Sequence, residues 1–221
     1  MALVGRITSS IAHSVRNPLM IIGGFARSML KNSPSTDPKR TFIESIVAET
    51  RQLEGVLDEI LNYSDSLYPT RDFWDVNQLV ESALRDSADS MLSFGYATSY
   101  THGDNLPPTY IDFKQLSYCL RTVLHNDIIG VGENRSIVID SRNENDRVVI
   151  RIEDRSRHIS QSELDRLLVP FSETRDLGAG LGLALCKTML EKQGIPFSAL
   201  ADQYEGIRYT ITLPTRKEEQ T

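Results

Sequence analysis

Apolar residues recur at helical spacing through the first third of the chain. One stripe, repeating every three or four positions, contains Val4, Ile7, Ile11, Val15, Leu19, Ile22, Ala26 and Met29. A polar stretch over residues 31–40 includes Pro34 and Pro38 and predicts a loop. A heptad pattern follows over residues 41–67. The pattern therefore predicts two long helices, over residues 3–30 and 41–67, joined as an antiparallel hairpin.

A hairpin of this kind leaves apolar surface uncovered on both of its helices. Pairing with a second copy would give a dimeric four-helix bundle, whereas packing against the rest of the same chain is the alternative. We expect the homodimer, because the heptad pattern continues over most of the second helix.

His13 lies away from the apolar stripe of the first helix. At about 100° per residue it points roughly 180° from the centre of that stripe, on the same face as Arg16, Asn17 and Met20. An imidazole that a rigid helix presents to solvent is available for chemistry. His13 is therefore a candidate catalytic residue.

Beyond residue 70 the pattern becomes mixed. Helical spacing predicts helices over residues 75–91, 113–129, 163–168 and 181–193, and alternation predicts strands over residues 96–101, 136–141, 147–153, 197–201 and 207–213. The polar residues 142–146 predict a hairpin turn. This order indicates an α+β sandwich, a mixed sheet with helices on one face. We expect two domains, over residues 1–69 and 70–216.

The composition of the chain argues against several classes of function. The chain has 221 residues and a formal net charge of −6, without a basic block, which argues against nucleic acid as the main partner. Cys119 and Cys186 lack metal-ligand spacing and predict buried, reduced thiols. No apolar run approaches the roughly 20 residues that cross a bilayer. We therefore expect a cytoplasmic protein, in which any contact with a membrane would be made by an upstream segment outside this sequence.

Three features of the second part are suited to binding a nucleotide. The glycine run from Gly178 to Gly182 opens a helix, whose N-terminus favours phosphate. Asp154 ends a strand, where its carboxylate can accept from an exocyclic amine, and the amide oxygen of Asn126 is a hard ligand for Mg²⁺. Taken singly, each has an ordinary alternative: a flexible loop, a turn aspartate and a polar residue near a helix end.

The order of short motifs along the chain resembles the catalytic core of sensor histidine kinases. The segments that carry the resemblance are residues 11–19 (IAHSVRNPL), 115–126 (QLSYCLRTVLHN), 149–154 (VIRIED), 170–171 (PF), 178–182 (GAGLG) and 209–214 (YTITLP). They resemble, in turn, the phosphoacceptor box, the asparagine box, the strand into the first glycine box, the phenylalanine box, the second glycine box and the closing strand.

The resemblance implies a fold and a mechanism. The hairpin would be the dimerisation and histidine phosphotransfer domain, and the sandwich would be an ATP-binding domain of the histidine kinase, topoisomerase II and chaperone type. His13 would receive the γ-phosphoryl group of ATP and pass it to an aspartate in the receiver domain of a response regulator. Asn17 would position water to hydrolyse the acyl phosphate of that regulator.

The resemblance also assigns the residues that bind ATP. Asn126 would hold Mg²⁺ and the phosphates, and Asp154 would bind the adenine amine. The remaining residues expected to contact the nucleotide are Phe171, Thr174, Arg175, Gly178, Gly180, Leu181 and Gly182.

Some positions depart from the family pattern. Ser14 stands where the family has an acidic residue, and Ser156 and His158 stand where it has glycines. These departures keep a second hypothesis open, a degenerate kinase that acts as a phosphatase, phosphotransfer or scaffold module without efficient use of ATP. A general ATPase of the same fold is a third.

Overall fold

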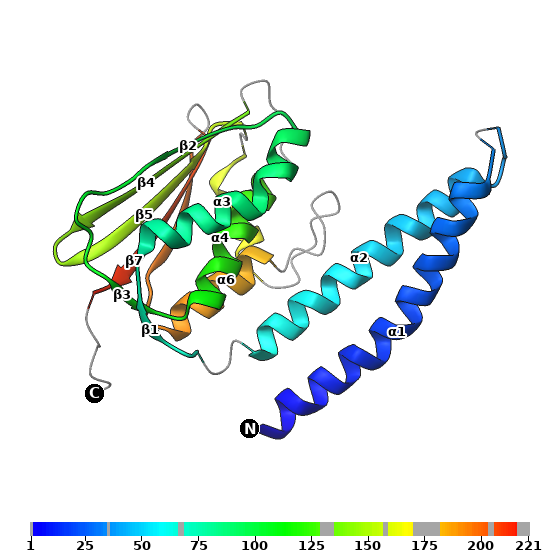
Figure 1. The fold of residues 1–221 in the computed structure, drawn as a ribbon, viewed down its shortest axis with the longest axis horizontal. Helices are drawn as coiled ribbons and strands as arrows, with labels where there is room; N and C mark the ends of the chain where they lie inside the picture. Colours follow the sequence, from blue (N-terminus) through cyan, green and yellow to red (C-terminus); the bar gives the residue numbers. More distant parts are fainter. Residues whose placement is uncertain are drawn as a thin grey trace. The chain divides into compact units, whose positions relative to one another are not determined.

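The computed structural model describes residues 2–34, 36–65, 69–128, 135–156, 159–169, 182–202 and 206–215. Within its helices, the side chains of residues 2–13, 58–65 and 126–128 are outside that description. The chain divides into two compact units, Met1–Leu67 and Tyr68–Thr221 (Figure 1).

The first unit is a pair of long helices, as the apolar spacing predicts. Helix α1 covers Ala2–Asn32 and continues through Pro18, and α2 covers Arg40–Asp65. The turn between them is held by side chains: the hydroxyl of Ser33 donates to Asp37 at 2.8 Å, and the guanidinium of Arg40 donates to the carbonyl of Ser33 at 2.9 Å. The bond from Arg40 satisfies the backbone carbonyl that directly follows the end of α1.

The apolar stripe expected on α1 divides into two rows, of which only one is buried in the hairpin. Leu19 and Ala26 are buried against α2, whereas Val15, Ile22 and Met29 are exposed by 41%, 48% and 58%. Each row repeats at the heptad spacing of seven residues. One neighbouring helix covers only part of the apolar arc, which explains why the second row stays uncovered.

Helix α2 shows the same division into two rows. Among its described side chains, Ile43, Val47, Thr50 and Leu57 are buried, whereas the apolar residues Ile46 and Leu53 are exposed. Both helices of the hairpin therefore carry an uncovered apolar row.

The second unit contains a five-stranded sheet in the order β2-β4-β5-β7-β6. Its strands are β2 (Ala97–Thr101), β4 (Ser136–Glu144), β5 (Arg147–Asp154), β6 (Phe197–Asp202) and β7 (Gly206–Pro214). Strand β2 pairs in parallel with β4, and the other pairs are antiparallel. A separate antiparallel pair, β1 (Asp72–Trp74) with β3 (Thr109–Ile111), was not predicted from the sequence.

Helices cover one face of this sheet, which confirms the α+β sandwich. They are α3 (Val76–Ser93), α4 (Phe113–Ile128), α5 (Gln161–Leu167) and α6 (Gly182–Lys192). Figure 1 shows α3, α4 and α6 lying together in front of the strands. One apolar core joins the two layers, for example Leu120 of α4, Leu190 of α6 and Ile150 of β5.

The turn between β4 and β5 is shorter than the polar segment suggested. Both strands run up to a two-residue connection, Asn145 and Asp146, whose φ angles are +52° and +60°. Two successive positive φ values are typical of the hairpin turn that matches strand twist. The strands therefore include residues that were expected in the loop.

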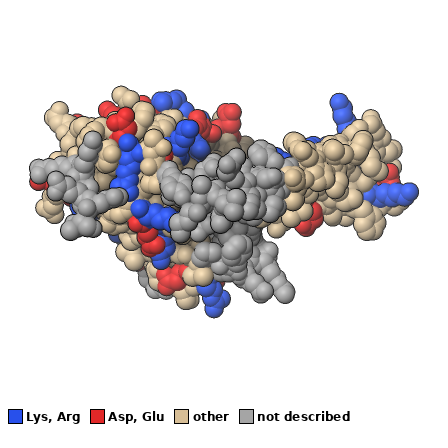
Figure 2. All heavy atoms as spheres, turned by 90° about the horizontal axis from the view of Figure 1, so that it is seen from below, with Lys and Arg blue, Asp and Glu red and all other residues tan. Residues whose placement is uncertain are grey.

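No described helix is long and apolar enough to cross a bilayer. On the face drawn in Figure 2, the described Lys and Arg side chains are interspersed with Asp and Glu side chains.

Candidate functional site

Asp154 is the buried carboxylate of the candidate site. It is the last residue of β5, and its side chain is 0% exposed. Residues two apart on a strand share a face, so Asp154 lies on the same face as Ile150 and Ile152, the face that packs into the core beneath the helices. Burial of a carboxylate is costly unless hydrogen bonds compensate for the lost water, so a functional reason is expected for its place here.

Ser156 supplies those hydrogen bonds. The backbone N–H and the hydroxyl of Ser156 both donate to Oδ1 of Asp154, at 2.8 and 2.5 Å. The hydroxyl of Tyr96, just before β2, lies 2.9 Å from the Ser156 hydroxyl. All three side chains are buried. The carboxylate is thus held by a small polar cluster at the end of the sheet.

Gly206 brings the neighbouring strand close to this residue. It begins β7 with a φ of +94°, and a Cβ placed on it would collide with the carbonyl oxygen of Asp154. Any other residue would therefore push the two strands apart. Glycine at this position fixes the backbone from which the Asp154 side chain extends.

Two helices hold the other described parts of the predicted nucleotide site. Asn126 lies in the last turn of α4, and its side chain is outside the described residues. Asp112 caps the other end of this helix, because its Oδ1 accepts from the backbone N–H of Gln115 at 3.0 Å and its Oδ2 accepts from that of Thr70 at 2.6 Å. Gly182 is the first residue of α6, where open backbone N–H groups favour phosphate.

The contact between α4 and α6 contains both cysteines. Cys119 and Cys186 are free and buried, as expected, and each sulfur lies 3.9 Å from the carbonyl oxygen of the other residue. Burial raises the pKa of the Cys119 thiol well above its usual range. Because a reactive cysteine is a thiolate, Cys119 acts as a packing residue that joins the two helices.

The candidate phosphoacceptor lies on α1. His13 is helical, and its side chain is outside the described residues. Asn17 and Met20, which follow on the same helix, are both exposed. The other predicted contacts with the nucleotide lie outside the described residues, namely Phe171, Thr174, Arg175, Gly178, Gly180 and Leu181, and so does His158.

Sequence reasoning missed two of the residues that surround Asp154. Tyr96 was seen only as the start of a strand, and Gly206 was not singled out. An isolated glycine at the start of a strand is a sequence signal for close backbone approach, and it was available for Gly206. No such signal exists for Tyr96, because its contact with Ser156 spans 60 residues.

Two family models match the chain in succession. The “His Kinase A (phospho-acceptor) domain” matches residues 3–67, and the “Histidine kinase-, DNA gyrase B-, and HSP90-like ATPase” matches residues 111–217. Similar curated proteins include sensor histidine kinase ZraS of Escherichia coli K12, 25% identical over all of this chain and 48% of its own length. Sporulation kinase E of Bacillus subtilis 168 is 25% identical over 99% of this chain and 29% of its own. The chain thus spans half or less of these two relatives.

Solved structures share the fold. Full-length ShkA, crystallised with AMPPNP, matches 95% of this chain and 45% of its own, with a TM-score of 0.73 and 18% identity. Histidine kinase ThkA, crystallised with response regulator protein TrrA, matches 99% of this chain and 64% of its own, with a TM-score of 0.68 and 24% identity. The chain comprises a phosphoacceptor domain followed by an ATPase domain, which together form a catalytic core. It therefore belongs to the sensor histidine kinases.

Proposed function

We propose that this chain is an ATP-dependent protein histidine kinase of two-component signalling, which phosphorylates itself on His13. Residues 1–69 form the dimerisation and phosphotransfer domain, and residues 70–216 form the ATP-binding domain. The observation that carries the proposal is the buried carboxylate of Asp154, which an α+β sandwich does not need for its own stability. We place this core in the cytoplasm, with any link to a membrane in a segment outside this sequence.

The described residues fit the adenine end of a nucleotide. Asp154 offers a buried acceptor, and the exocyclic amine of adenine is a donor of matching polarity, so their hydrogen bond would be charge-assisted. Gly182 begins α6, where backbone N–H groups and the helix dipole favour phosphate oxygens. Phe171, Thr174, Arg175, Gly178, Gly180 and Leu181 complete the proposed contacts along the chain between α5 and α6.

In the proposed reaction, His13 is the nucleophile. A neutral imidazole attacks through the lone pair of one ring nitrogen. A nitrogen–phosphorus bond forms, the bond from the γ-phosphorus to the bridging oxygen breaks, ADP leaves, and the ring proton passes to solvent. The side chain of Asn126 would hold Mg²⁺, which neutralises phosphate charge when bound.

We infer two partners from the surface of the hairpin, a receiver domain and a second copy of the chain. The phosphoryl group passes from His13 to an aspartate carboxylate in the receiver domain of a response regulator. Met20 is exposed on this helix and offers an apolar contact for such a domain. The uncovered rows on α1 and α2 suit a second copy of the hairpin, which would complete a dimeric four-helix bundle.

The proposal is tested with γ-labelled ATP and Mg²⁺. The wild-type chain should acquire label that is lost in acid and retained in base, as expected for a phosphohistidine. His13→Gln should abolish the label, and His102→Gln, which changes an exposed histidine just after β2, should keep it. No acid-labile label on the wild type, or label that survives His13→Gln, overturns the proposal.

Asn17 is the residue that we assign to a second reaction, the dephosphorylation of the response regulator. It is exposed four residues after His13, and we assign it the positioning of the water that hydrolyses the acyl phosphate of the regulator. Asn17→Ala should keep autophosphorylation of His13 and slow the dephosphorylation of a phosphorylated receiver domain by about tenfold or more. Equal rates of dephosphorylation for the two proteins would rule out this role.

A further inference from the structure

A chain of buried hydroxyl groups stands behind the Asp154 carboxylate. It begins at the Tyr96 hydroxyl, passes through the Ser156 hydroxyl at 2.9 Å, and ends on Oδ1 of Asp154 at 2.5 Å. The backbone N–H of Ser156 donates to the same oxygen at 2.8 Å. The three residues come from separate places in the second unit: the residue before β2, the end of β5 and the turn that follows β5.

The chemistry of the groups sets the direction of these bonds. An ionised carboxylate only accepts, so the Ser156 hydroxyl must donate to Asp154. Because the Ser156 hydroxyl uses its single hydrogen in the bond to Asp154, it can only accept a hydrogen bond from Tyr96. The Tyr96 hydroxyl is therefore the donor. The bonds run one way, from Tyr96 through Ser156 to Asp154, and none of the three groups can turn without breaking one of them.

Two donors on one oxygen hold the plane of a carboxylate. Oδ1 receives both the hydroxyl and the backbone N–H of Ser156, which restricts rotation of the Asp154 side chain. Hydrogen bonds weaken steeply as their angle departs from linear, so the orientation of this carboxylate decides how well it accepts from a nucleobase amine. Burial strengthens the effect, because little water is present to replace a misaligned bond.

We propose that Ser156 and Tyr96 are positioning residues, which orient the Asp154 carboxylate toward the exocyclic amine of adenine and so contribute to selecting adenine nucleotides. This inference rests on the proposed function, in which Asp154 binds that amine. Ser156 stands where the resembling family has a glycine, and here its side chain is directed at Asp154 and Tyr96. The departure from the family pattern thus acquires a role in binding.

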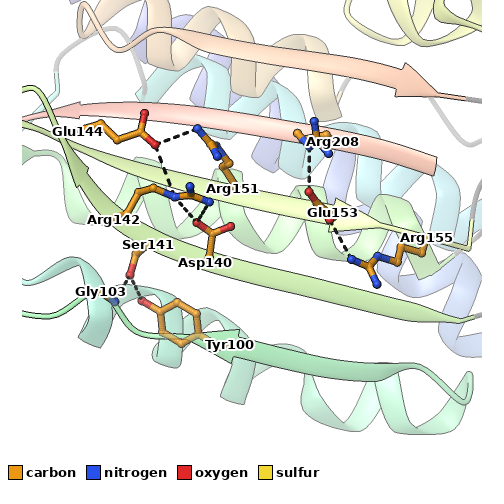
Figure 3. A network of polar contacts seen from close by, with 10 residues as sticks. All are labelled: Tyr100, Gly103, Asp140, Ser141, Arg142, Glu144, Arg151, Glu153, Arg155 and Arg208. Carbon is orange, nitrogen blue, oxygen red and sulfur yellow. Dashed lines mark hydrogen bonds and ion pairs between the residues drawn. The ribbon is translucent and has the colours of Figure 1, made fainter. Parts of the chain in front are cut away.

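A second tyrosine–serine pair in the same sheet provides a matched control. The Tyr100 hydroxyl in β2 lies 3.0 Å from the Ser141 hydroxyl in β4, and Ser141 accepts from the backbone N–H of Gly103 at 3.0 Å (Figure 3). Tyr100 also donates to the side chain of Asn77 at 2.6 Å. The two pairs have the same chemistry and both include a tyrosine at or beside β2, but only the Tyr96 pair reaches Asp154.

The experiment compares two ligands on the full chain by calorimetry with Mg²⁺. One is ADP, and the other is purine riboside 5′-diphosphate, which lacks the exocyclic amine and is otherwise the same. The ratio of their dissociation constants isolates the contact to the amine. The proteins are the wild type, Ser156→Ala, Tyr96→Phe, Ser156→Thr, which keeps a hydroxyl, and the control variants Ser141→Ala and Tyr100→Phe.

We expect the wild type to prefer ADP by about tenfold or more. Ser156→Ala and Tyr96→Phe should lower that preference by at least about threefold, through weaker binding of ADP with little change for the analogue. Ser156→Thr and both control variants should keep it. If Ser156 and Tyr96 only stabilise the fold, their variants should weaken the binding of both ligands equally and leave the ratio of dissociation constants unchanged. That result overturns the inference while the proposed function stands.

Two further results are also decisive. If the wild type binds ADP without preferring it to the analogue, Asp154 does not bind the amine, and the inference fails. If the wild type binds neither ligand, the proposed function fails and the inference fails with it. Should Ser156→Ala prove unfolded by its melting curve, Tyr96→Phe, which removes one oxygen atom, decides the test.

Discussion

The Asp154 carboxylate can be buried at the end of a core strand because neighbouring residues donate hydrogen bonds to it and leave room for its backbone. Ser156 donates two hydrogen bonds to Oδ1, and Gly206 lets the backbone of β7 approach the carbonyl of Asp154. The alternating pattern of β5 located Asp154 at a strand end in the sequence. Its burial was not predictable, because burial depends on residues that lie far away along the chain.

Gly206 should be the glycine least tolerant of substitution among those described. In Gly206→Ala the new Cβ must displace the Asp154 backbone, and the φ of +94° is unfavourable for alanine, so we expect a loss of unfolding free energy of at least about 2 kcal/mol. Chemical denaturation measures the loss. Gly95→Ala is the matched control, because its φ is +73° and nothing lies within 4 Å of the added Cβ. Equal losses for both variants would contradict the steric argument.

Ser14 should limit the rate of autophosphorylation. The resembling family has an acidic residue after the phosphoacceptor, and a general base contributes about 10²–10⁴-fold to a reaction. Ser14→Glu should therefore raise the initial rate of labelling at His13 by about tenfold or more at saturating ATP. Ser14→Gln, similar in size but unable to accept a proton, is the control. A rate unchanged by the glutamate would show that proton removal does not limit the reaction.

At the scale of elements, longer segments were more predictable than short ones. Helices α3, α4 and α6 lie within two residues of the ranges that their apolar spacing predicts. Strands β1 and β3 were missed because each has three residues, too few to show an alternation. Their pairing is also separated in the chain by α3 and β2, so only the folded structure brings them together.

Glu153 should make the pairing of β5 with β7 sensitive to acid. Partial burial alone would raise the pKa of this carboxyl, but ion pairs with Arg155 at 3.2 Å and Arg208 at 2.9 Å outweigh it and hold the pKa below the ordinary 4.5 (Figure 3). A carboxyl with a lowered pKa stabilises the fold above its unfolded pKa, and this stabilisation disappears as the pH falls through the folded value.

Glu153→Gln should therefore lower the unfolding free energy at pH 7 by up to about 1 kcal/mol, and the difference from wild type should shrink below about pH 4.5. Urea denaturation across this pH range measures it. Glu191→Gln, at an exposed residue 4.0 Å from Lys187, is expected to behave as wild type throughout. A difference between Glu153→Gln and wild type that persists at low pH would mean that the ion pairs are not its source.

At the scale of the whole molecule, the hairpin carries more apolar surface than its own two helices bury against each other. Val15, Ile22 and Met29 on α1 are exposed at intervals of seven residues, and so are Ile46 and Leu53 on α2. A helix with two adjacent heptad rows is suited to two neighbours, one of which is the other helix of the hairpin. The sequence predicted the apolar surface but not its division into rows, because spacing alone does not say which neighbour covers which position.

The exposed rows should therefore form the interface between two copies of the chain. The double variant Ile22→Glu, Leu53→Glu places carboxylates in that interface and should raise the dissociation constant of the dimer by at least about a hundredfold. Light scattering during size-exclusion chromatography should then report a monomer where the wild type is a dimer. Helical content by circular dichroism should persist, because neither side chain contributes to the buried row within the hairpin. Ser28→Glu, at an exposed position on the opposite side of α1 from Leu19 and Ala26, is the control and should remain dimeric. A double variant that remains a dimer would place the interface elsewhere, and the exposed rows would then need another partner.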